Sequence, residues 1–208
     1  MSALPRIHVS IAGNIGAGKS TLVSLLAASA GLQPFPESVA DHPYLADYYV
    51  DPSRWAFHSQ IAFLTQRLEQ HRAILAHAGP VCQERSIYED YAVFGTTLWR
   101  QGMLSERDFR IYERLFRAST ADLPPPTLLV LLTAPIGALQ QRIARRGRHA
   151  ERGIATEYLA YLERGYHDWM AAWQACPVLV IGTDAFDLAN DPIAQQAVAR
   201  QVRLAAGL

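Results

Sequence analysis

Short apolar runs alternate along the chain with longer segments that have helical spacing. The runs lie near residues 6–12, 32–37, 80–84, 127–133 and 177–182. Most are the length of a strand covered on both faces, and the segments between them have the period of a helix. Glycine and proline residues mark the joints. The pattern predicts an α/β fold in which a five-stranded parallel sheet has helices on both faces.

The longest helical segment spans roughly residues 52–78. Its apolar residues recur at helical spacings, which predicts a stripe that packs into the core. Three other residues share a neighbouring face of the same helix. The predicted stripe consists of Phe57, Ile61, Leu64, Leu68 and Leu75, and the neighbouring face carries Gln60, Phe63 and Arg67.

Composition narrows the class of protein. The 208 residues are 50% hydrophobic and 18% charged, which indicates a single domain over residues 1–208. The formal net charge is zero, so we expect a small-molecule partner and neither a nucleic acid polymer nor a membrane. Cys82 and Cys176 lack disulfide or zinc-site spacing and are interpreted as buried thiols. With no apolar run near about 18 residues and no signal-peptide pattern, we expect a cytoplasmic protein.

The stretch GNIGAGKST, at residues 13–21, follows the first predicted strand and begins a helix. It matches the phosphate-loop pattern G-x-x-x-x-G-K-[ST]. Its glycines let backbone N–H groups surround a phosphate, the lysine reaches the outer phosphates of a nucleoside triphosphate, and the serine hydroxyl ligates Mg²⁺. The predicted phosphate-binding residues are Gly13, Asn14, Gly16, Ala17, Gly18, Lys19, Ser20 and Thr21.

A phosphate loop alone fits a GTPase switch, a motor ATPase or a small-molecule kinase. The sequence contains neither the N-K-x-D motif that reads guanine nor the D-x-x-G switch motif, which argues against a GTPase. A motor would place an aspartate at the end of the third strand, where this chain has Glu84. The remaining interpretation is phosphoryl transfer to a bound acceptor.

Two glutamates support that interpretation. Glu37 and Glu84 are predicted to end the second and third strands, at the sheet edge that also holds the phosphate loop. One carboxylate can accept the proton of an attacking hydroxyl while the other holds the metal. We therefore assign these two chemical tasks to the pair.

Several motifs in this order resemble the deoxynucleoside kinases, particularly the bacterial deoxyadenosine and deoxyguanosine kinases. They are GNIGAGKST, the glutamate of FPESV, the pattern Y-x-x-P-x-R-W-x-F-x-x-Q over residues 49–60, Glu84-Arg85-Ser86 followed by Asp90, and RIARRGRHAERG at 142–153. The resemblance spans nearly the whole chain. It implies a P-loop kinase with strand order 2-3-1-4-5, Mg²⁺, ATP as phosphoryl donor and a homodimer.

The resemblance also implies individual roles. Glu37 is the expected general base on the 5′-hydroxyl, Glu84 joins Ser20 in the magnesium shell, and Arg85 damps charge at the 5′-oxygen and orients Glu37. The sugar 3′-hydroxyl is assigned to Tyr49 and Glu151, and the base edge to Gln60. Arg67 and Asp90 form a charged pair at the base. Apart from the resemblance, the position of Phe63 on the same helix face as Gln60 suits packing on the sugar or base, with an ordinary core aromatic as the alternative.

Residues 142–153 form the expected arginine-rich lid. Phosphoryl transfer depends on positioning and on neutralising charge, which arginines on a closing segment can supply. Gly147 and Gly153 give the segment freedom to close. The expected catalytic arginines are Arg142, Arg146 and Arg148, whereas Arg145 departs from the family pattern and is interpreted as a surface residue.

The pattern indicates the nucleobase only in part. Gln60 offers a donor and an acceptor, which suit adenine, cytosine or, with the amide reversed, guanine. In the family, a pair such as Arg67 and Asp90 accompanies purines and deoxycytidine and is missing from thymidine-preferring members. We expect deoxyadenosine as the favoured substrate, with deoxyguanosine and deoxycytidine alongside it. The alternatives are a nucleoside monophosphate kinase such as thymidylate kinase and a nucleotide-binding regulatory module without turnover.

Overall fold

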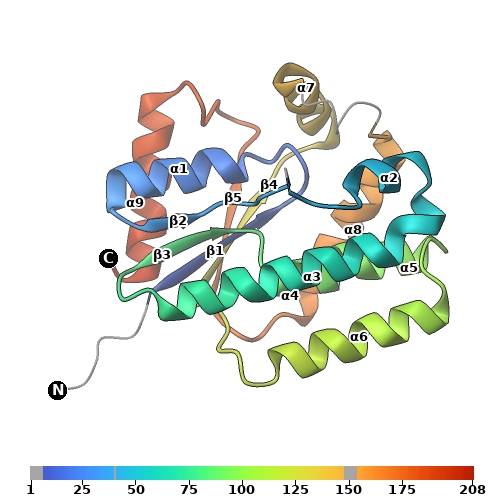
Figure 1. Cartoon of the computed structure of the whole chain (residues 1–208). Helices are drawn as coiled ribbons and strands as arrows, with labels where there is room; N and C mark the ends of the chain where they lie inside the picture. Colours follow the sequence, from blue (N-terminus) through green and yellow to red (C-terminus); the bar gives the residue numbers. More distant parts are fainter. Residues whose placement is uncertain (1–6, 40, 148–153) are drawn as a thin grey trace.

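The computed structural model describes residues 7–39, 41–147 and 154–208. Its sheet is parallel throughout, and the strands lie in the order β2-β3-β1-β4-β5, as predicted. Helices cover both faces of the sheet (Figure 1). The strands are β1 (His8–Gly13), β2 (Gln33–Phe35), β3 (Val81–Glu84), β4 (Leu128–Thr133) and β5 (Val178–Gly182).

The helices follow the strands in an alternating order, and a π-helical segment, η1, interrupts one of them. In chain order the helices are α1 (Lys19–Ala30), α2 (Leu45–Val50), α3 (Pro52–Ala76), α4 (Ile87–Glu89), η1 (Asp90–Gly95), α5 (Thr96–Arg100), α6 (Glu106–Thr120), α7 (Ile136–Arg146), α8 (Thr156–Ala172) and α9 (Pro192–Ala206).

The side chains of β4 alternate between two apolar clusters, as expected of a strand buried on both faces. Leu128, Val130 and Leu132 pack with residues of α1 and α9. Leu129 and Leu131 point the other way and pack with residues of η1 and α8. The sheet is therefore the middle layer of the domain, and its carboxyl-terminal edge carries the loops that hold the candidate site.

Strand β2 is shorter than predicted. It ends at Phe35, so Glu37 follows the strand rather than ending it. Pro36 has no N–H group and cannot donate to a sheet ladder, which accounts for the early end. Glu84, by contrast, is the last residue of β3, as predicted.

Helix α3 packs most of its predicted apolar stripe against a core cluster and also buries a second, largely polar face. Of the predicted apolar stripe, Leu64 is buried, whereas Phe57, Ile61 and Leu68 are half-buried against a cluster that includes α6. Polar residues occupy much of the buried face, where Arg67 bonds Asp90 and Glu37 and His71 bonds the Pro124 carbonyl. The buried residues of α3 are Ala56, Ser59, Gln60, Leu64, Arg67, His71 and Ile74.

Two further expectations bear on the surface of the protein. Cys82 is buried, as predicted, but Cys176 is only half-buried, so the interpretation of both as buried thiols was wrong for Cys176. No helix within the described ranges has the length and apolar character needed to cross a membrane.

Candidate active site

The phosphate loop joins β1 to α1 through glycines in conformations that other residues rarely adopt. The φ angles of Gly13, Gly16 and Gly18 are 146°, 84° and 104°. A side chain at Gly13 would also collide with the Leu132 carbonyl of the neighbouring strand. These glycines allow the loop to turn tightly, and α1 begins immediately after them at Lys19.

Lys19 is buried and lies along the loop. Its Nζ atom donates to the carbonyl oxygens of Gly13 at 2.7 Å and Asn14 at 3.0 Å. Burial, with a smaller contribution from the charge of Arg85, lowers the pKa of Lys19 to about 8. The ammonium group is still mostly protonated at neutral pH, so it can neutralise a phosphate bound in the loop.

Two buried residues that the sequence did not indicate hold the start of the loop. Glu89 Oε1 accepts a hydrogen bond from the Gly13 N–H at 3.3 Å. The hydroxyl of Tyr166, on α8, lies within hydrogen-bond distance of both Glu89 Oε1 and the Gly13 carbonyl. The only sequence signal for Glu89 is a carboxylate directly before Asp90 in a short helical turn. Tyr166 gave no signal, because its contact spans 153 residues.

Ser20 and Glu84 lie together, as a shared metal shell requires. The Ser20 hydroxyl donates to Glu84 Oε1 at 2.7 Å. Both side chains offer oxygen, the ligand atom that Mg²⁺ prefers. Across the described residues, no group of three His, Cys, Asp or Glu side chains could hold a metal ion. The pair would supply two oxygen ligands to a magnesium ion.

Four charged side chains from separate segments form a buried network on the acceptor side. Arg67 Nε lies 2.8 Å from Asp90 Oδ2, and Arg67 Nη2 lies 2.5 Å from Glu37 Oε1. Arg85 Nε lies 3.1 Å from the same Glu37 oxygen, without the angle of a hydrogen bond, so this contact is an ion pair only. The predicted Arg67–Asp90 pair is present, but the sequence did not indicate that Arg67 also contacts Glu37.

The network keeps Glu37 ionised. Burial by itself would raise the pKa of this carboxyl, but the charges of Arg85, Arg67 and Lys19 outweigh it and lower the pKa to about 2. The pKa of Arg85 lies well above its usual value, because Glu37 and Glu89 more than offset the effect of burial. Glu37 and Arg85 thus stay ionised across the neutral range, whereas burial raises the pKa of Asp90 above its usual value.

Arg85 is held in a strained backbone conformation. Its φ angle is 60°, a left-handed value that is uncommon outside glycine. Its N–H donates to the Ile11 carbonyl at 3.0 Å, and its guanidinium lies 4.1 Å from the centre of the Phe94 ring. Such strain concentrates at functional sites. It turns the Arg85 side chain toward Glu37 instead of continuing the direction of β3.

The base-reading candidates surround two unpaired polar atoms. Within the described residues, Gln60 Oε1 and Arg67 Nη1 are buried and have no hydrogen-bond partner. The Phe63 ring packs against that of His42, with centroids 4.0 Å apart, and its centre lies 6.0 Å from the Arg67 guanidinium carbon. Tyr49 is 44% exposed on α2. A ligand that supplies one donor and one acceptor would satisfy the two buried atoms.

The lid residues are only partly described. Arg142 lies on α7 and donates to the Thr183 hydroxyl at 2.8 Å and to the Thr183 carbonyl, so it contacts the segment after β5. Arg146 is the last residue of α7. Arg145 is exposed and lies 3.4 Å from Asp187, consistent with a surface position. Arg148 and Glu151 lie outside the described residues.

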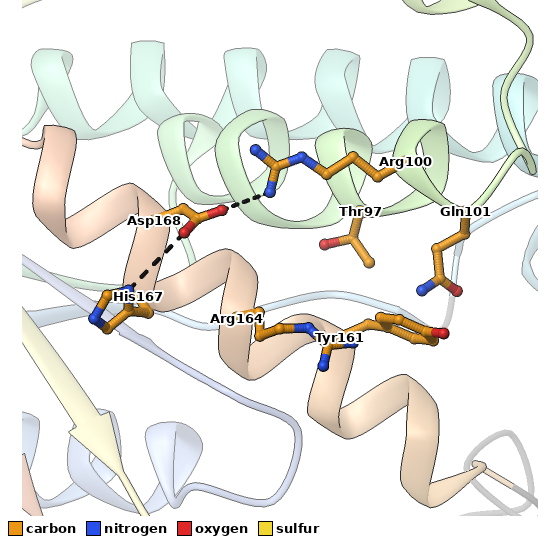
Figure 2. A pocket seen from close by; sticks show the side chains of 7 residues that line it. All are labelled: Thr97, Arg100, Gln101, Tyr161, Arg164, His167 and Asp168. Atoms are coloured by element: carbon orange, nitrogen blue, oxygen red, sulfur yellow. Dashed lines mark hydrogen bonds and ion pairs between the residues drawn. The ribbon is translucent and has the colours of Figure 1, made fainter.

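A separate hollow opens between α5 and α8, as Figure 2 shows. Its volume is about 320 Å³, and Arg100 and Asp168 form an ion pair of 2.6 Å within it. None of its lining residues belongs to the phosphate loop or to the acceptor network. The lining residues are Thr97, Arg100, Gln101, Tyr161, Arg164, His167 and Asp168.

Known proteins resemble the chain over almost its full length. The family model described as deoxynucleoside kinase matches residues 9–205. A deoxyadenosine/deoxycytidine kinase of Bacillus subtilis is 36% identical over 185 residues, which cover 88% of this chain and 85% of the relative. A deoxyadenosine kinase of Lactobacillus acidophilus is 33% identical over 202 residues, with coverage of 92% and 93%.

A solved structure has the same fold. The deoxyadenosine kinase from M. mycoides with bound dCTP superposes with a TM-score of 0.80 and covers 95% of this chain and all of its own. Its sequence is 23% identical, so the comparison supports the fold alone.

Proposed function

The chain belongs to the deoxynucleoside kinase family, and we propose that it transfers the γ-phosphoryl group of ATP to the 5′-hydroxyl of purine deoxynucleosides. Phosphorylation of deoxynucleosides follows from the family. Our proposal adds deoxyadenosine as the favoured acceptor, deoxyguanosine and deoxycytidine as further acceptors, and ATP as donor. The observation that carries it is the buried, unpaired Gln60 Oε1 on the same face of α3 as Arg67, which pairs with Asp90.

On the donor side, the loop N–H groups and Lys19 bind the phosphates. The positive end of α1 adds to their field. Ser20 and Glu84 would hold Mg²⁺, which neutralises charge on the phosphates when it is bound. Arg142 and Arg146 approach from α7, and we propose that they join Arg148 over the donor.

On the acceptor side, Glu37 orients the 5′-hydroxyl and receives its proton. In the transfer, the bond from the γ-phosphorus to the β,γ-bridging oxygen breaks and a bond to the 5′-oxygen forms, while the hydroxyl proton passes to Glu37. A carboxylate with a pKa near 2 is a weak base. It suffices because a loose phosphoryl transfer needs orientation more than early removal of the proton. Arg85 offsets the negative charge that develops at the 5′-oxygen.

The nucleobase is read from α3. Gln60 Oε1 accepts from the amino group of adenine, and its amide N–H₂ donates to adenine N1. Arg67 and Asp90 lie at the same edge, where a pyrimidine with two carbonyl groups would leave their charges poorly matched, so we propose that thymidine is disfavoured. Phe63 packs on the base or sugar, and Tyr49 and Glu151 bind the 3′-hydroxyl.

The acceptor network argues against a monophosphate kinase. An acceptor phosphate needs a spare cation near Gln60, but the charge of Arg67 is already matched by Asp90 and Glu37. A regulatory module that binds a nucleotide without turnover would not need a carboxylate held between two arginines. Glu37 nevertheless forms ion pairs with both Arg67 and Arg85. Homodimer formation and a cytoplasmic location stay predictions, the first of which sedimentation velocity would test.

Product analysis tests the reaction itself. Purified protein would be incubated with magnesium ATP and deoxyadenosine, and in parallel with magnesium ATP and thymidine monophosphate. We expect deoxyadenosine 5′-monophosphate and ADP in equal amounts from the first mixture. From the second mixture we expect no thymidine diphosphate. Transfer to the monophosphate alone, or to neither acceptor, would contradict the proposal.

A further inference from the structure

Glu37 lies on a segment of backbone that the sheet does not hold. β2 pairs with β3 only from Gln33 to Phe35. Beyond that point, the N–H of Glu37 lies 3.4 Å from Glu84 Oε2, a long contact for a hydrogen bond. A segment without sheet partners opens easily. Some other contact must therefore fix the backbone on which the acceptor carboxylate depends.

Two glutamines of α3 supply that contact. Gln70 Nε2 donates to the Pro36 carbonyl at 2.8 Å, and Gln66 Nε2 donates to the Ser38 carbonyl at 2.8 Å. The two side chains are one helical turn apart and therefore lie on the same side of α3. The carbonyls that they bind belong to the residues immediately before and after Glu37.

We infer that Gln66 and Gln70 are positioning residues for the acceptor carboxylate, acting through the backbone on either side of Glu37. Arg67, from the same helix, contacts the carboxylate directly. Helix α3 thus holds Glu37 by its side chain and by both flanking carbonyls. The inference rests on the proposed role of Glu37 as acceptor of the hydroxyl proton.

A chain of buried amides fixes the orientation of the Gln70 side chain. Gln70 Oε1 accepts from Gln83 Nε2 at 2.8 Å, and Gln83 Oε1 lies 2.9 Å from His8 Nε2. Because Gln83 Oε1 can only accept from the ring, Gln83 presents its N–H₂ group to Gln70. The Gln70 oxygen is therefore committed to Gln83, and its N–H₂ group must point to Pro36.

Gln66 has an unsatisfied buried oxygen, which lowers stability, and its role as a donor explains why a glutamine stands there. Its Oε1 atom is buried and has no partner among the described residues. An unsatisfied buried acceptor destabilises the folded state. An apolar side chain would avoid that cost, so stability alone does not account for the glutamine. Its bond to the Ser38 carbonyl does.

Two substitutions separate the positioning role from support of the fold. Gln70→Glu keeps an acceptor for Gln83 and removes the donor to Pro36. Gln66→Leu removes the donor to Ser38 together with the unsatisfied oxygen. The matched control is Gln195→Leu, because Gln195 Nε2 also donates to two loop carbonyls, those of Leu188 at 3.0 Å and Ala189 at 3.2 Å, away from Glu37.

Each variant would be measured in the wild-type and Glu37→Gln backgrounds, at saturating ATP. We expect Gln66→Leu and Gln70→Glu each to lower kcat for deoxyadenosine by roughly 10-fold to 10²-fold, since a small misplacement of a reacting group has effects of this size. In the Glu37→Gln background they should change kcat by less than about twofold, because the carboxylate they position is gone. Gln195→Leu should leave kcat unchanged.

Equal losses of kcat in both backgrounds, or no loss in either, would overturn the inference while leaving the proposed function intact. Full turnover by Glu37→Gln would instead refute the proposed role of Glu37. Amide hydrogen exchange of residues 37–39 then decides whether the glutamines hold the segment. Faster exchange in Gln66→Leu and Gln70→Glu than in Gln195→Leu supports it, and unchanged protection contradicts it.

Discussion

The donor side and the acceptor side of the candidate site are built in opposite ways. The donor side is one continuous loop, residues 13–21, whose shape depends on glycine backbone angles. The acceptor side joins Glu37, Arg67, Arg85 and Asp90, which come from four separate segments and meet only through side chains. A change to one loop residue therefore acts largely alone. A change to one acceptor residue leaves another buried charge unmatched, so acceptor-side effects should be coupled.

The largest expected effect comes from the acceptor carboxylate. Glu37→Gln should lower kcat by about two to four orders of magnitude, the usual range for a positioned base, while deoxynucleoside binding stays roughly intact. Pre-steady-state kinetics with a measured deoxyadenosine Kd would separate the two. Unchanged turnover would remove Glu37 from this role and weaken the acceptor half of the comparison.

The donor side should show a large but simpler loss. Lys19→Met removes the buried ammonium that reaches the phosphates, and kcat should fall by about 10²–10³-fold, as for loss of one charge-stabilising donor. The deoxyadenosine Kd should not change, because Lys19 lies on the donor loop. A Kd that weakens as much as kcat falls would show that the two sides are not separable.

Mildly acidic pH should lower the stability of the folded protein through His8. Burial lowers the pKa of His8 to about 4 from the usual 6.5, despite its contact with Gln83. Between these two pH values, His8 binds a proton in the unfolded chain but stays neutral in the folded protein. The free energy of unfolding should therefore fall by about 3 kcal/mol as the pH drops from 6.5 to 4. Urea unfolding across this range would measure it.

The control for that prediction is His8→Gln, which should flatten the stability profile between pH 6.5 and 4. Glu37 interferes only at the acid end of this range, because its lowered pKa places its own contribution between its usual value of 4.5 and about 2. A slope that persists in His8→Gln would assign the effect to other groups, such as His71, whose pKa is also lowered by burial.

The smallest effect expected is a change of preference. Replacing Arg67 and Asp90 together, as Arg67→Met with Asp90→Leu, removes both charges and should shift the ratio of kcat/KM for deoxyadenosine over thymidine by about 10-fold toward thymidine. Arg67→Met alone should be less stable than the double variant, because Asp90 would be left buried and unpaired. An unaltered ratio would mean that the pair does not face the base.

The same contrast explains what the sequence could reveal. The strands and the loop were predictable because short apolar runs and a contiguous motif report local structure, whereas the strand order followed from the resemblance to the family. The burial of the polar face of α3 was not predictable, since it depends on partners such as Asp90, which bonds Arg67 from 23 residues further along the chain. Glu89, Tyr166, Gln66 and Gln70 escaped notice for the same reason. Their roles consist of contacts to backbone atoms of distant segments.

The most direct test of the account is a comparison of kcat/KM for the four natural deoxynucleosides with magnesium ATP. The central claim is that Gln60, Arg67 and Asp90 form a purine-reading set, so deoxyadenosine should have the highest kcat/KM and thymidine the lowest. Thymidine at or near the top would contradict that claim, even if the phosphate loop and Glu37 act as described.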